Sequence, residues 1–130
     1  KLGPYINMGA VDAQVRLELQ KEFDEIQKVQ KEIQKSAELQ KKLDSQLNQN
    51  TVVKDELEFL EPESNVYKLT GPVLVKQDLG EAKGTVSKRI EYISAEIKRQ
   101  ETLVADLEKQ LNKHKESVSK IQAKATAVAH

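Results

Sequence analysis

The C-terminal half of the chain has a regular pattern of apolar residues. From Val86 to Val128 the apolar positions alternate four and three residues apart, and most residues between them are charged or Gln. This seven-residue repeat is typical of a coiled-coil helix, which buries one narrow seam against a partner helix. Asp78 and Glu81 resemble a capping box, so the spacing predicts a helix over residues 79–128. The expected seam is Val86, Ile90, Ile93, Ile97, Gln100, Val104, Leu107, Leu111, His114, Val118, Ile121, Ala125 and Val128.

The N-terminal half carries a less regular version of the same pattern. One frame ends at Gln40 and a second begins at Leu43, a step of three residues where four are due, so we expect the seam to slip there. Pro62 cannot continue a helix, and a helix is therefore predicted over residues 12–60. The first frame is Leu19, Phe23, Ile26, Gln30, Ile33, Ala37 and Gln40, and the second is Leu43, Gln46, Asn50, Val53, Leu57 and Leu60.

Glycine and proline are confined to residues 3–9 and 62–84, so two uninterrupted segments flank one short insert. In the insert, two runs rich in β-branched and aromatic residues, 66–70 and 73–77, are separated by Gly71-Pro72. That arrangement predicts a β-hairpin at residues 65–77. The expected fold is mostly α: a long antiparallel two-helix coiled coil with one β-hairpin inserted between the helices, forming a single domain over residues 9–130.

Residues 1–8 do not join the helical pattern, and Met8 is the only methionine. We interpret them as an added leader with Met8 as the natural start, and a native flexible arm is the alternative.

The predicted hairpin is a candidate interface between chains. A lone two-stranded hairpin is marginally stable in water and leaves two open edges. This hairpin carries apolar groups on both faces and has no further strand in its own chain to pair with. We therefore expect strands from other chains to complete it. The predicted interface residues are Val66, Tyr67, Leu69, Val73, Leu74 and Val75.

Antiparallel pairing would bring the two chain ends together in a tip, and this tip is a candidate binding surface. It holds more apolar residues than one seam can accommodate, beside basic residues such as Lys113 and Lys120. An apolar patch of this kind can contact a partner. The alternative is an ordinary seam with Ala chosen for helix propensity. The candidate binding residues are Val11, Val15, Leu17, Leu19, Val118, Ile121, Ala125 and Val128.

The composition argues against several classes of function. Twenty-one basic residues balance 21 acidic ones, which argues against a nucleic-acid partner, and the chain has no Cys. No apolar run is long enough to cross a bilayer, so we expect an intracellular protein that binds no membrane. No catalytic set, metal site or nucleotide motif is recognisable, and neither an enzyme nor a cofactor is predicted. His114 lies at a seam position, where it either sets the register or acts as a ligand or switch.

Two runs in the middle of the chain resemble the β-class subunits of the prefoldin family. They are SNVYKLTGPVLVKQDLGEA at residues 64–82 and TVSKRIEYISAEIKR at residues 85–99, and the preceding NTVVKDEL at residues 50–57 also fits. The resemblance is specific over residues 48–101, although Gln100 stands where an aromatic residue is expected.

The resemblance implies one of six chains, two α-class and four β-class, whose hairpins form a barrel platform with helical tentacles. It further implies an ATP-independent holdase of the cytoplasm, which binds unfolded actin and tubulin at the tentacle tips and passes them to the cytosolic chaperonin. The alternative function is a structural coiled-coil adaptor or tether that docks through its hairpin.

Overall fold

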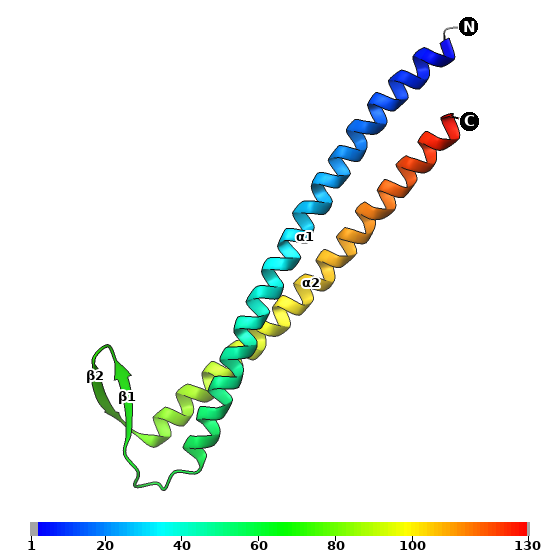
Figure 1. The fold of residues 1–130 in the computed structure, drawn as a ribbon. Coiled ribbons are helices and arrows are strands. Elements are labelled where there is room, and N and C mark those ends of the chain that lie inside the picture. Colours follow the sequence, from blue (N-terminus) through cyan, green and yellow to red (C-terminus); the bar gives the residue numbers. More distant parts are fainter. Residues whose placement is uncertain (1–2, 130) are drawn as a thin grey trace. The chain divides into compact units, whose positions relative to one another are not determined.

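The computed structural model describes the backbone of residues 3–129 and the side chains of residues 13–127. Helix α1 spans Gly3–Glu58, strands β1 and β2 span Val66–Thr70 and Val73–Gln77, and helix α2 spans Leu79–Ala129 (Figure 1). The expected order of helix, hairpin and helix is confirmed. Helix α1 begins nine residues before the predicted start at residue 12 and ends two residues before the predicted end at residue 60.

The structure divides into two compact units. Unit 1 consists of Lys1–Ala37 and Thr102–His130, and unit 2 is Glu38–Glu101. In each unit a segment of α1 lies beside a segment of α2 and runs in the opposite direction (Figure 1). Because each unit contains only one pair of helix segments, each helix has only one seam to bury, and most of its surface stays exposed.

Helix α2 buries the seam that its sequence predicts. From Val86 to Ala125 every predicted seam residue is at least partly buried, including the polar Gln100 and His114. Val86, Ile93 and Leu107 are the most buried of them. An unbroken four–three spacing is sufficient to fix the buried face of this helix, because the spacing matches the helical repeat over its whole length.

The expected seam of α1 is wrong in detail. Apart from Glu25, the partly or fully buried positions form one unbroken series, and no slip occurs at Gln40. Phe23 and Val53, which were assigned to the seam, are exposed, while the polar Glu22 and Ser36 take seam positions. The apolar pattern of α1 therefore predicts the wrong frame, because some apolar residues lie next to the seam and some polar residues lie within it. The observed seam is Val15, Leu19, Glu22, Ile26, Val29, Ile33, Ser36, Gln40, Leu43, Leu47, Asn50, Lys54 and Leu57.

In unit 2 a small apolar cluster fastens the hairpin to the helices. Leu57, Ala82 and Val86 form its buried centre, and Val66, Leu79 and Ile90 pack around them. Helix α2 starts at a capped end, because the backbone N–H of Glu81 donates to Oδ2 of Asp78 at 3.1 Å. The cap satisfies one of the free N–H groups at the helix start, as the Asp78 spacing predicts.

We predict that the seam carries the stability of the coiled coil. Leu107 is 3% exposed and Leu103, one turn earlier, is 44% exposed. Leu107→Ala should therefore lower the free energy of unfolding by about 2–5 kcal/mol, because it leaves a cavity. Leu103→Ala removes the same atoms from a largely solvated site and should cost clearly less. Thermal unfolding followed by circular dichroism measures both, and equal losses would contradict the assigned seam.

Candidate functional site

The hairpin presents an apolar face that its own chain leaves uncovered. Strands β1 and β2 pair antiparallel with Leu69 opposite Leu74 and Tyr67 opposite Lys76. Directly opposed residues share a face, so Tyr67, Leu69 and Leu74 lie together. These three side chains are 54%, 69% and 65% exposed. The described residues form a sheet of these two strands alone, so both of its edges are unpaired.

The opposite face of the hairpin is turned partly to its own chain. Val66 lies opposite Gln77, Lys68 opposite Val75, and Thr70 opposite Val73. Val66 packs on the Leu57 cluster, so its own chain partly covers this one of the six predicted interface residues. The physical reason is its place at the base of β1, next to the helices. Val73 and Val75, further from the base, remain about half exposed.

The turn of the hairpin depends on one glycine. Thr70 pairs with Val73, so Gly71 and Pro72 are the two turn residues, and Gly71 has a φ of 59°. A positive φ followed by the fixed negative φ of proline suits a type II′ turn, whose twist matches that of the two strands. Gly71-Pro72 therefore fixes the register that gathers Tyr67, Leu69 and Leu74.

In unit 1 the structure divides the candidate tip residues into two groups. Leu17 is 70% exposed and lies outside the seam. Five others are partly buried seam residues, which are Val15, Leu19, Val118, Ile121 and Ala125. Val11 and Val128 lie outside the residues whose side chains are described. The N-terminal end of α1 and the C-terminal end of α2 lie at the same end of this unit (Figure 1), as antiparallel pairing requires.

A polar pair joins the two helices near this tip. Nδ1 of His114 lies 2.7 Å from Oε2 of Glu22, and both side chains are largely shielded from water. An ionised carboxylate only accepts hydrogen bonds, so the imidazole donates. A shift of one heptad would bring Leu107 or Ile121 opposite Glu22 and leave its carboxylate without this donor. The contact favours the interpretation of His114 as a residue that sets the register.

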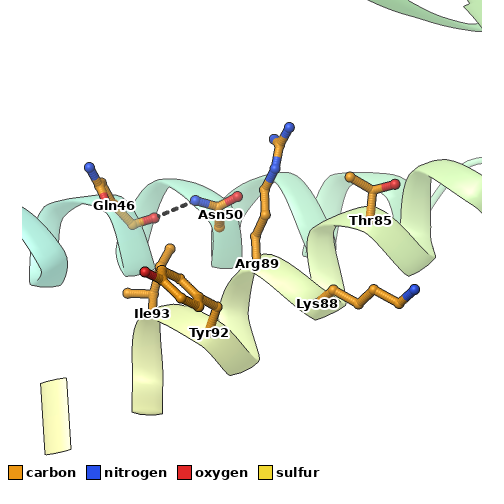
Figure 2. Close-up of a pocket in the computed structure, with 7 residues that line it drawn as sticks. All are labelled: Gln46, Asn50, Thr85, Lys88, Arg89, Tyr92 and Ile93. Carbon is orange, nitrogen blue, oxygen red and sulfur yellow. Dashed lines mark hydrogen bonds between the residues drawn. The ribbon is translucent and has the colours of Figure 1, made fainter. Parts of the chain in front are cut away.

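A groove in unit 2 was not expected from the sequence. Gln46 and Asn50 of α1 and Arg89 and Tyr92 of α2 line it, and the amide nitrogen of Asn50 donates to the carbonyl oxygen of Gln46 at 2.7 Å (Figure 2). Its signal in the sequence is weak, because the lining residues lie partly in the seam and partly beside it and share no motif. Among the described residues, no group of three or more His, Cys, Asp or Glu side chains could hold a metal ion. No described helix has the length and apolar character needed to span a membrane.

Comparison with known proteins decides the family. The family described as "Prefoldin subunit" matches residues 20–125. The chain is 46% identical to mouse prefoldin subunit 6 over 108 residues, which is 83% of this chain and 85% of the mouse protein. The chain belongs to the prefoldin family. It is also 46% identical to Arabidopsis thaliana prefoldin subunit 6 over 111 residues, covering 85% of this chain and 86% of the plant protein.

A solved prefoldin structure has the same fold. The crystal structure of the prefoldin beta subunit from Thermococcus strain KS-1 matches with a TM-score of 0.70 at 23% identity, covering 82% of this chain and 91% of the archaeal chain. The resemblance of residues 48–101 to β-class prefoldin subunits is therefore confirmed, as is the expected fold class. Membership of the prefoldin family supports a co-chaperone role and assembly with other prefoldin subunits.

We predict that Gly71 is required for the turn. Ala tolerates a positive φ poorly, at a cost of roughly 1–2 kcal/mol, so Gly71→Ala should destabilise the hairpin. Gly84 is a matched control, because it lies within α2 and a Cβ added there would meet no neighbouring side chain within 4 Å. Gly84→Ala should therefore be neutral or stabilising. Amide hydrogen exchange across residues 66–77 measures the effect. Unchanged protection in Gly71→Ala would show that the turn does not need glycine.

Proposed function

We propose that this chain is a β-class subunit of a hexameric, ATP-independent holdase of the cytoplasm. Its hairpin joins those of the other prefoldin subunits in a shared barrel, and its coiled-coil tip binds unfolded polypeptides such as actin and tubulin. The assembly then delivers these clients to the cytosolic chaperonin. No step requires catalysis, a cofactor, a nucleic acid or a membrane.

The main observation in support of the proposed assembly is the exposed apolar face of the hairpin. Tyr67, Leu69 and Leu74 are more than half exposed on a sheet whose two edges pair with no other strand in the described part of the chain. Such a surface is stable only when other strands cover it, because unpaired edges and apolar faces both favour association. Because the chain belongs to the prefoldin family, other prefoldin subunits are the partners that would provide these strands.

Client binding rests on the outward-facing part of the tip. Leu17 is exposed at its end of unit 1, and Ala123 and Ala127 are exposed on α2. Such side chains can contact the scattered apolar residues of an unfolded chain, each buried aliphatic group contributing on the order of 1.5–3 kcal/mol. One tip should bind weakly, since ordering both partners opposes binding. Several tips on one platform would raise the effective concentration and make capture useful.

We predict that the two faces of the hairpin differ in their importance for assembly. Leu74→Asp places a carboxylate directly opposite Leu69, on the apolar face that also holds Tyr67, and should break the hexamer, because burying an unpaired charge costs several kcal/mol. In Val75→Asp the new carboxylate lies opposite Lys68 and can form a cross-strand ion pair with it, so this substitution should weaken the hexamer less. Size-exclusion chromatography of the reconstituted complex measures assembly, and circular dichroism checks the helices. An intact hexamer in both variants would show that the hairpin is not the interface.

We predict that the tip of this subunit contributes to holding clients. Removing residues 118–130 should weaken the suppression of aggregation of an unfolded protein, without nucleotide, and leave assembly through the hairpin intact. Leu17→Ser should weaken it in the same direction, while Leu103→Ser, an exposed leucine away from the tip, should not. All three variants are measured in complexes reassembled with the partner subunits. Full holding by the truncated complex would favour a tether, or client binding by other subunits.

A further inference from the structure

The groove in unit 2 shares no residue with either the hairpin face or the tip. It is open to solvent and has a volume of about 540 Å³, and its lining residues are Gln46, Asn50, Thr85, Lys88, Arg89, Tyr92 and Ile93 (Figure 2). Ile93 is only 6% exposed and forms an apolar base, whereas Tyr92 is 67% exposed. The groove therefore combines a packed apolar surface with an accessible aromatic ring. The proposed holdase function uses neither.

Apolar residues continue along α1 on the same side. Leu39 and Val53 each lie seven residues from Gln46, and residues at this spacing occupy the same position around a coiled-coil helix. Leu39 is 39% exposed and Val53 is 40% exposed. Each is next to the seam without being buried in it. The side of the seam that holds the groove is thus extended by further exposed apolar surface.

The charge in the groove has one sign. Lys88 and Arg89 are its charged residues, and no carboxylate lines it. Within the described part of the chain, neither side chain takes part in an ion pair or a hydrogen bond. Arg89 extends toward α1 beside Asn50, and Lys88 points away from Tyr92 (Figure 2). An arginine with unused donors is well suited to bind a carboxylate through two parallel hydrogen bonds.

We propose that this groove docks an acidic peptide segment of a partner protein. An aromatic or leucine side chain of the segment lies on Tyr92 and Ile93, and a neighbouring carboxylate binds Arg89. Apolar contact provides the affinity, and the positive charge selects acidic segments over basic ones. A nucleic-acid partner is less consistent with the surface, because the chain has 21 basic and 21 acidic residues and the groove offers two cations.

The chain itself contains a segment of the required chemistry, which provides a defined probe. Residues 55–61, DELEFLE, combine four carboxylates with Phe59, which is 89% exposed. This segment cannot enter the groove of its own chain, because α1 is a continuous helix up to Glu58. Asn50 and Glu58 are therefore held about 12 Å apart along the helix axis. A labelled synthetic copy of the segment can bind only as a separate molecule.

The test is the fluorescence anisotropy of that labelled peptide titrated with the full chain. We expect saturable binding that Lys88→Glu combined with Arg89→Glu weakens at least tenfold, and that Tyr92→Ala weakens several-fold. Lys28→Glu combined with Lys31→Glu is the matched control, since it reverses two exposed charges on α1 in unit 1, and binding should be unchanged. Circular dichroism of every variant confirms that the helices are intact. Peptides with Gln in place of the acids, or Ser in place of Phe59, should bind at least tenfold more weakly.

Several results would overturn the proposal. They include no binding, equal binding by the Lys88→Glu/Arg89→Glu variant, and equal binding of the Gln-substituted peptide. Displacement of the peptide by an equal concentration of a single-stranded oligonucleotide would show that the groove binds nucleic acid instead. Sedimentation velocity of the unlabelled chain provides a further check. If the chain self-associates and the Lys88→Glu/Arg89→Glu variant does not, a second copy of the chain occupies the groove. That result would overturn the assignment to a partner protein.

Discussion

The pairing of α1 with α2 along a single seam is the interaction on which the rest of this protein depends. Two helices side by side can bury only one stripe each, and the most buried side chains lie on those stripes, with Leu107 at 3% exposure and Val29 at 5%. Apart from the few that pack around the Leu57 cluster, the other apolar residues must remain exposed or be covered by another molecule. The exposed apolar face of the hairpin, Leu17 at the tip and the groove beside Tyr92 are all consequences of this constraint. A protein built in this way has little interior and many surfaces available to partners.

The polar residues within the seam give it direction and register at some cost in stability. The pair formed by His114 and Glu22 is satisfied only when these two residues are opposite each other. Asn50 instead directs its amide to the carbonyl oxygen of Gln46 on its own helix. A seam made of leucine alone would be more stable but would tolerate shifts by whole heptads. A fixed register matters in unit 2 as well, because side chains from both helices border the groove.

The hairpin shows how a small element can be held by its own chain and yet remain incomplete. Val66 is attached to the Leu57 cluster, so the base of the hairpin has a defined place in unit 2. Beyond that base, Leu69 and Leu74 are mostly exposed, and no further strand of the described residues pairs with the strand edges. This division is what the proposed assembly through the hairpin requires, because the exposed part can be covered while the base stays attached to the helices.

The amino-acid sequence alone determined the order of elements, the seam of α2, the cap at Asp78 and the turn at Gly71-Pro72, because each of these depends on local spacing or backbone preference. It misassigned the seam of α1, because Phe23 and Val53 lie one residue from the true stripe while Glu22, Ser36 and Lys54 lie within it. Burial depends on the facing helix, which a one-dimensional pattern does not contain. The contact of His114 with Glu22 and the groove between Asn50 and Tyr92 join residues far apart in sequence, and only the tertiary structure decided them.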